Sequence, residues 1–320
     1  EHLRRMMPRG TGHLYFTSSR DELVDKGLRC LRLSRPKARI TVGYEGGYVG
    51  HISGAARSVS DPAGFGPSFS LFEWPRIPHP QEGSTRSLAA LESIVHREGA
   101  DAILAVVVEV VGERSGHVLA GEQAVSLYEL CKKHDLPLVF VETASGGYRC
   151  GPGPWACNNL PPSVIPDMVL WYPGGQLGNV FVSDRYWVGK PLTLISTWDG
   201  DEVSMIRTHE HLRAARKLGP GPLVAAGEAF GRLLGEVASK REGVRMGGMG
   251  LYRTLSFPTP ELADRFHALA LAAKIRFGRG LPGTLVAAPS LSIEVDTITA
   301  MREPLVRCIE EVSSEPQKAT

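Results

Sequence analysis

Residues 102–111 read Ala-Ile-Leu-Ala-Val-Val-Val-Glu-Val-Val, and this run constrains the fold more than any other segment of the chain. A β-strand so apolar must be covered on both faces, which is typical of strands inside a parallel sheet. Shorter apolar strands alternate around it with segments of helical spacing. The expected strands are 14–17, 40–44, 138–142 and 168–172, and the expected helices are 21–32, 88–98 and 120–134. This order predicts an α/β fold with a mostly parallel, doubly wound sheet.

The chain is long enough for two domains. Its 320 residues change in composition at a Gly-Pro-Gly-Pro run, residues 219–222. We therefore expect a large domain over 1–219 and a small α+β domain over 220–320. Residues 54–86 are rich in Pro, Gly and Ser and predict a long loop. In the small domain the expected elements are helices at 223–239, 260–274 and 293–312 and strands at 251–257 and 285–288.

The charge of the chain gives no reason to expect a nucleic acid or a membrane as a partner. Its 36 basic and 34 acidic residues leave a formal net charge of +2, which provides no electrostatic basis for binding a polyanion. The longest apolar stretch, residues 102–108, is far too short to span a bilayer. The five cysteines form no C-x-x-C pair, which indicates buried, reduced thiols in a cytoplasmic protein.

Two strand ends carry the most informative motifs. Residues 138–151 read Leu-Val-Phe-Val-Glu-Thr-Ala-Ser-Gly-Gly-Tyr-Arg-Cys-Gly, and residues 166–181 read Pro-Asp-Met-Val-Leu-Trp-Tyr-Pro-Gly-Gly-Gln-Leu-Gly-Asn-Val-Phe. In order and spacing they resemble the class III aminotransferase family, of the ornithine and 4-aminobutyrate type. The first motif of that family contains the acid that pairs the pyridine nitrogen of pyridoxal phosphate, and the second contains the Schiff-base lysine. Val141 and Pro173 stand at these two positions.

The resemblance also implies a phosphate-binding turn at residues 16–22, which read Phe-Thr-Ser-Ser-Arg-Asp-Glu. Ser19 and Arg20 are the candidate cofactor-binding residues of this turn. Arg20 replaces a glycine of the family, and Asp21 would repel a phosphate at close range. The alternative is that Ser19 or Asp21 caps a helix.

Three further candidates for cofactor binding follow from the same resemblance. Tyr48, in Tyr-Glu-Gly-Gly-Tyr-Val-Gly, matches the aromatic residue that covers the cofactor ring, or else packs in a glycine-flanked turn. Glu109 matches an acid of the active-site wall, or else reaches solvent at the end of its strand. Thr197, in Ser-Thr-Trp-Asp-Gly-Asp-Glu, matches a threonine that reaches the phosphate of the neighbouring subunit.

The cation that binds the substrate carboxylate is also replaced. Val286 stands where the family has this arginine, whereas Arg149 matches a structural arginine of the family. The residues that would perform the family's chemistry are thus replaced, whereas the glycines around them are retained. We expect an α/β protein of the fold-type I PLP-transferase kind in which the N-terminal segment of the family is absent.

The expected function is that of a catalytically degenerate homologue: a pseudoenzyme that serves as dimer partner or binding module. The resemblance implies pyridoxal phosphate as cofactor, although the missing lysine and acid argue against its binding, and it implies a homodimer or a heterodimer with an active homologue. One alternative is an active pyridoxal-phosphate-dependent aminotransferase with shifted catalytic residues. Another is a protein that binds a small anion non-covalently, with Arg20 as the cation.

Overall fold

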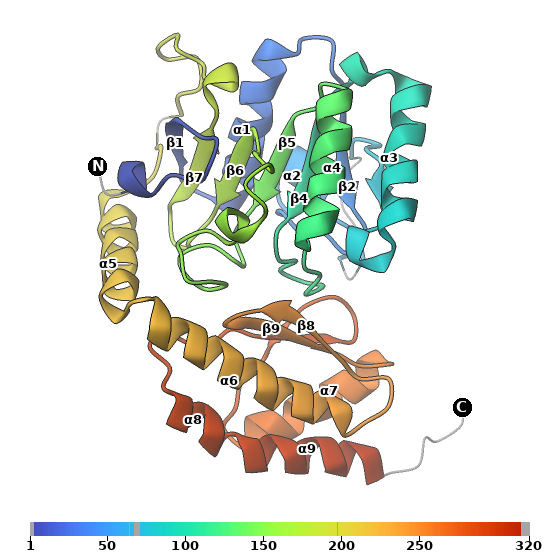
Figure 1. Ribbon diagram of the computed structural model, residues 1–320, viewed down its shortest axis with the longest axis vertical. Helices are drawn as coiled ribbons and strands as arrows, with labels where there is room; N and C mark the ends of the chain where they lie inside the picture. The colour runs from blue at the N-terminus through green and yellow to red at the C-terminus, as the bar shows by residue number, and fades with distance from the viewer. Residues whose placement is uncertain (1–2, 64, 67–70, 197, 315–320) are drawn as a thin grey trace.

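A seven-stranded sheet forms the centre of the larger part of the protein (Figure 1). The computed structural model describes residues 3–63, 65–66, 71–196 and 198–314. The strand order is β1-β7-β6-β5-β4-β2-β3. The bounds are β1 His13–Thr17, β2 Ile40–Tyr44, β3 Arg76–Ile77, β4 Ile103–Glu109, β5 Leu138–Val141, β6 Met168–Trp171 and β7 Gly178–Val182.

Neighbouring strands from β3 to β6 are parallel, which confirms the expected mostly parallel sheet. The exception is β7, which runs antiparallel to both β6 and β1 and was not predicted. The reason is the short connection between β6 and β7, residues 172–177, because a parallel neighbour would need a crossover of a dozen residues or more.

Helices cover both faces of this sheet, as a doubly wound fold requires. One face packs against α1 (Arg20–Ser34) and α2 (Gly54–Val59). The other packs against α3 (Ser84–Glu98) and α4 (Gly121–Lys133). The predicted loop over 54–86 is therefore wrong in part: besides α2 it contains β3, a short 3-10 helix at Pro80–Glu82 and the start of α3. Elements this short leave little periodicity to detect among prolines and glycines.

A second, four-stranded antiparallel sheet lies in the C-terminal part, in the order β10-β11-β9-β8. Four helices pack around it, and α5 leads into this part from the large sheet (Figure 1). The strands are β8 Arg245–Met249, β9 Tyr252–Ser256, β10 Gly278–Arg279 and β11 Thr284–Ala287. The helices are α5 Glu202–Leu218, α6 Pro220–Ser239, α7 Pro260–Ala272, α8 Val295–Ala300 and α9 Arg302–Ser314. The division into domains at residue 219 stays a prediction.

The single helix predicted over 293–312 is wrong, because the structure has α8 and α9 with a break at Met301. Pro304 explains the break. It has no N–H to donate to the carbonyl four residues earlier, so it fits the first turn of a new helix better than the middle of a long one. The remaining 3-10 helices are Leu3–Met6, Ala100–Ala102, Ala156–Asn159 and Asp184–Tyr186.

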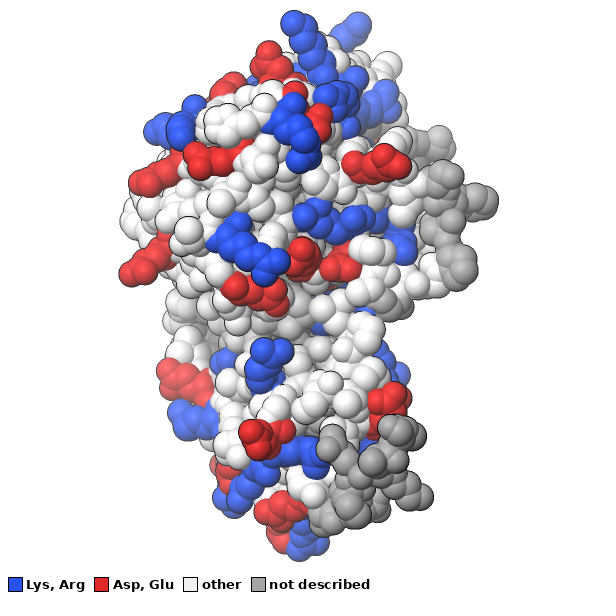
Figure 2. Space-filling view, turned by 90° about the vertical axis from the view of Figure 1, so that its right-hand side faces the viewer, with Lys and Arg blue, Asp and Glu red and all other residues white. Residues whose placement is uncertain are grey.

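The distribution of charged side chains and the burial of the cysteines are those of an ordinary folded protein. Basic and acidic side chains are interspersed on the face drawn in Figure 2. All five cysteines are buried and free. Among the helices that the structure describes, none combines the length and the apolar character needed to cross a bilayer.

Candidate functional site

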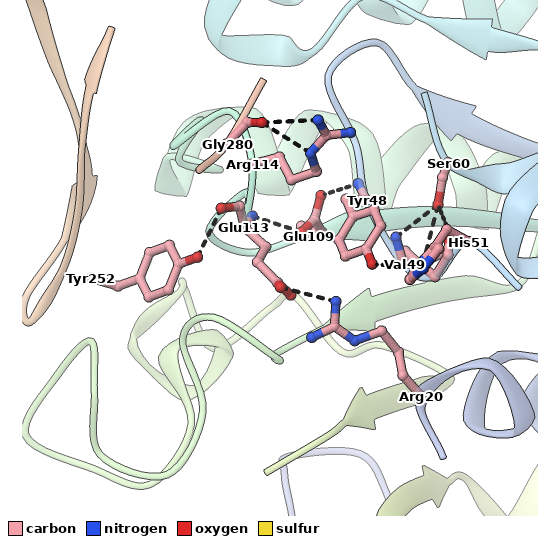
Figure 3. Close-up of polar contacts among 11 residues, drawn as sticks. Arg20, Tyr48, Val49, His51, Ser60, Glu109, Glu113, Arg114, Tyr252 and Gly280 are labelled. Carbon is pink, nitrogen blue, oxygen red and sulfur yellow. Dashed lines mark hydrogen bonds and ion pairs between the residues drawn. The ribbon is translucent and has the colours of Figure 1, made fainter. Parts of the chain in front are cut away.

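Glu109, the last residue of β4, is buried beside the sheet edge where parallel strands end. It pairs in register with Val141 at the end of β5. Its two carboxylate oxygens accept the backbone N–H groups of Tyr48 at 2.7 Å and of Glu113 at 2.8 Å (Figure 3). Burial raises the pKa of Glu109 to about 8, against the opposing effect of these two hydrogen bonds. The side chain therefore fixes two loops and does not reach solvent.

Arg20 lies at the start of α1 and forms an ion pair with Glu113. The distance from its Nη1 to Oε1 of Glu113 is 2.9 Å, and the two side chains are only 20% and 21% exposed. The guanidinium carbon lies over the Tyr48 ring at 4.9 Å from its centroid and over the Tyr172 ring at 5.4 Å. Burial alone would lower the pKa of Arg20, but the carboxylate of Glu113 reverses this and raises it.

The start of α1 uses its own polar groups for capping. Ser19 is the N-cap and accepts the N–H of Glu22, whose carboxylate in turn accepts the N–H of Ser18 at 2.8 Å. Asp21 accepts the N–H groups of Ile52 and Ser53 at 2.7 and 2.8 Å and so ties α1 to the start of α2. Ser19 therefore caps the helix, which was the alternative expected for it. Asp21 links α1 to the start of α2 instead.

The positions of the expected acid and lysine hold no titratable group. Val141 is 3% exposed and packs in the apolar core. The neighbouring Glu142 is fully buried and accepts the N–H of Cys157 at 2.6 Å, so its carboxylate is committed to a loop. Pro173 lies two residues after the end of β6 and carries no amine.

Lys26 and Lys190 both line one open groove of the surface. Lys26 donates to the carbonyl of Phe16 at 2.9 Å and pairs with Asp199. Asp199 lines the same groove. Thr197 lies outside the described residues. Arg149 donates to the carbonyl of Pro289 at 2.8 Å, consistent with the structural role that was expected for it.

The residues at the expected cofactor positions do not fit pyridoxal phosphate. Covalent attachment needs a lysine amine, and Pro173 supplies none. An acid must pair the ring nitrogen, and Val141 cannot. The aromatic face of Tyr48 is already covered by a guanidinium. The cavity lined by Glu109 and Tyr44 measures about 10 Å³, which is the space of one water molecule.

A much larger cavity lies elsewhere. It has a volume of about 460 Å³ and is walled by apolar side chains of β1, α5 and adjoining loops, including Leu14, Phe16, Trp187, Met205 and Leu212. None of the candidate residues that the structure describes lines it. In the part of the chain that the structure describes, no group of three or more His, Cys, Asp or Glu side chains is arranged to hold a metal ion.

The loop after β4 supplies the residues that sequence reasoning missed. Tyr252 in β9 donates its hydroxyl to the carbonyl of Glu113 at 2.8 Å, and Arg114 donates to the carbonyl of Gly280 at 2.9 Å (Figure 3). One signal was available, since Glu113 and Arg114 follow an apolar strand at the carboxyl edge of a parallel sheet, where sites usually form.

The known proteins to which this chain is similar in sequence are aminotransferases, although no family model matches the chain. It is 29% identical over 233 residues to the mitochondrial acetylornithine aminotransferase of Eremothecium gossypii, covering 68% of this chain and 52% of that protein. It is 29% identical over 216 residues to an L-lysine-epsilon aminotransferase of Mycobacterium tuberculosis, covering 62% and 47%. The chain spans about half the length of the curated relatives it matches.

Solved structures agree on the fold. A lysine aminotransferase from M. tuberculosis superposes with a TM-score of 0.84 at 22% identity, over 95% of this chain and 76% of that one. A transaminase from the marine bacterium Virgibacillus superposes with a TM-score of 0.86 at 18% identity, over 98% and 78%. The expected PLP-transferase fold is thereby confirmed.

Proposed function

The chain belongs to the class III aminotransferase family, and on that premise we propose that it is a degenerate member without lysine-dependent transamination. It acts as a binding module or as one subunit of a dimer. The ion pair of Arg20 with Glu113 carries this proposal, because it lies against Tyr48, the residue that matches the family's cofactor-stacking aromatic. Val141 and Pro173 support it, since neither can take part in the family's chemistry.

Covalent trapping tests the proposal directly. The protein is purified with pyridoxal 5′-phosphate, reduced with borohydride and analysed by mass spectrometry, with the lysine aminotransferase of M. tuberculosis as positive control. We expect an adduct on the control and none on this chain. An adduct on any lysine would instead support an active enzyme with shifted residues, and peptide mapping would identify that lysine.

The dimer is a separate part of the proposal. Large apolar side chains are exposed close together in sequence, namely Leu192 at 78%, Ile195 at 63%, Val203 at 73% and Ile206 at 64%. Such side chains favour contact with another protein surface, either a second copy or an active homologue. Light scattering of the wild type should give the mass of a dimer, and Ile206→Glu should shift it toward the monomer.

The cellular location is likewise proposed. Five buried, free cysteines are typical of a reducing compartment, which favours the cytoplasm. Fractionation of cells that express the tagged protein would test it, and recovery outside the cytoplasmic fraction would count against the proposal.

A further inference from the structure

We propose that Arg20 is an internal ligand: its guanidinium occupies the space against the rings of Tyr48 and Tyr172, here called the slot, and excludes flat aromatic ligands from it. The inference deepens the proposed function, on which it rests. It names the residue that closes the site and the class of ligand that this residue keeps out: a flat heteroaromatic ring that carries a phosphate.

The position of the guanidinium against two aromatic rings supports the inference. A guanidinium is planar and cationic, and it binds the faces of aromatic rings. The guanidinium carbon of Arg20 lies over two such faces, 4.9 Å from the centroid of Tyr48 and 5.4 Å from that of Tyr172. The same two faces are surfaces on which a flat ring would stack. Arg20 and an aromatic ligand would therefore compete for the same space.

The acid that holds Arg20 is itself fixed from several sides. The N–H of Glu113 donates to Glu109, and its carbonyl accepts the hydroxyl of Tyr252 (Figure 3). The next residue, Arg114, donates to the carbonyl of Gly280. Glu113 is thus held between the large sheet and the C-terminal part, so its carboxylate is already placed to receive Arg20.

The other end of the ion pair is equally well fixed. Arg20 is the first residue of α1, and the next residue, Asp21, accepts the backbone N–H groups of Ile52 and Ser53. Because the fold holds both backbones, only the entropy of the two side chains is lost when they pair. Arg20 therefore competes well against an added ligand.

A phosphate group needs a positive charge beside the rings, because Ser19 already caps the N-terminus of α1 and Asp21 and Glu22 add negative charge there. Arg114 adds a positive charge, since its guanidinium carbon lies 5.7 Å from the Tyr48 centroid. Without Arg20, the carboxylate of Glu113 would repel the phosphate. Removal of both charges, as in Arg20→Ala/Glu113→Gln, should therefore open the slot most effectively.

Calorimetric titration with pyridoxamine 5′-phosphate tests the proposal. This probe has no aldehyde, so its binding needs no lysine and is independent of the trapping experiment. We expect Arg20→Ala/Glu113→Gln to bind it at least about tenfold more tightly than the wild type, the factor that one aromatic stacking contact supplies. Arg39→Ala is the matched control, because it removes an arginine from an exposed Arg–Glu pair of 2.8 Å, and it should bind like the wild type.

Two results would overturn the proposal. One is equal affinity of the wild type and the folded double variant. The other is the same gain with inorganic phosphate alone, because the rings would then contribute nothing. Arg20→Lys keeps a positive charge beside Glu113 and should preserve the fold, yet its ammonium is not planar. It should bind the probe at least about threefold more tightly, and equal affinity there would also refute the proposal. None of these results depends on a covalent adduct, so they test the inference separately from the proposed function.

Discussion

The protonation of Glu109 should make the stability of this protein depend on pH. Burial raises the pKa of its carboxyl to about 8, from an ordinary value of 4.5 that returns in the unfolded chain. Between these two values the folded protein binds a proton that the unfolded chain has released. The free energy of unfolding therefore falls as the pH rises through this window. Below pH 4.5 the contribution is fully present, and above about pH 8 it is lost.

The size of the effect follows from the same values. Within the window the free energy of unfolding should fall by up to about 1.4 kcal/mol per pH unit. Glu109→Gln removes the titrating group and keeps its shape. The new amide presents an NH₂ group to one of two backbone N–H groups, from Tyr48 or Glu113, at a cost of about 1–3 kcal/mol. The wild type should therefore be the more stable protein at pH 5, by a margin that shrinks toward pH 8.

Urea denaturation at pH 5, 6, 7 and 8, followed by circular dichroism, measures this margin. Glu113 and Glu142, whose pKa values burial also raises, are present in both proteins and cancel in the comparison. Glu98→Gln serves as control. Hydrogen bonds from Arg97 and Arg39 lower the pKa of Glu98, so its loss should leave the pH dependence from 5 to 8 unchanged. A margin between wild type and Glu109→Gln that stays constant over this range would refute the reasoning.

Three further substitutions test the packing, each by its effect on urea or thermal denaturation. Gly116→Ala should destabilise by about 3 kcal/mol, since φ is +72° and the new Cβ would lie 2.0 Å from Oγ1 of Thr254; a neutral result would contradict this contact. Glu142→Ala should cost about 1–3 kcal/mol, because the buried N–H of Cys157 loses its acceptor. Phe266→Ala should cost about 3–5 kcal/mol in the C-terminal core, whereas Leu271→Ala, half-exposed on the same helix, should stay within about 0.5 kcal/mol.

The main strands were predictable because their signal is local. Residues 40–44 were expected as a strand and form β2 with those bounds, since an apolar run of strand length is visible in the sequence itself. β4 lies inside its expected range, and all seven of its residues are buried, which is why its composition indicated cover on both faces. The errors at 54–86 and 293–312 concern short elements and a helix break, where local signals are weakest.

The candidate site was predictable only as separate residues. Arg20, Tyr48 and Glu109 were each identified from a motif, and the structure links the three of them through Glu113 and its neighbours. Glu113 was not identified, because nothing in its local sequence says which cation it meets.

The sequence by itself determined the strand and helix order, the family resemblance and the absence of a lysine at residue 173. These depend on which residues stand at which positions. Only the tertiary structure decided that the guanidinium of Arg20 lies against Tyr48 and pairs with a carboxylate 93 residues further along the chain. The physical reason is that stacking and ion pairing act over a few ångströms in space, and such distances exist only once the sheet has brought remote strand ends together.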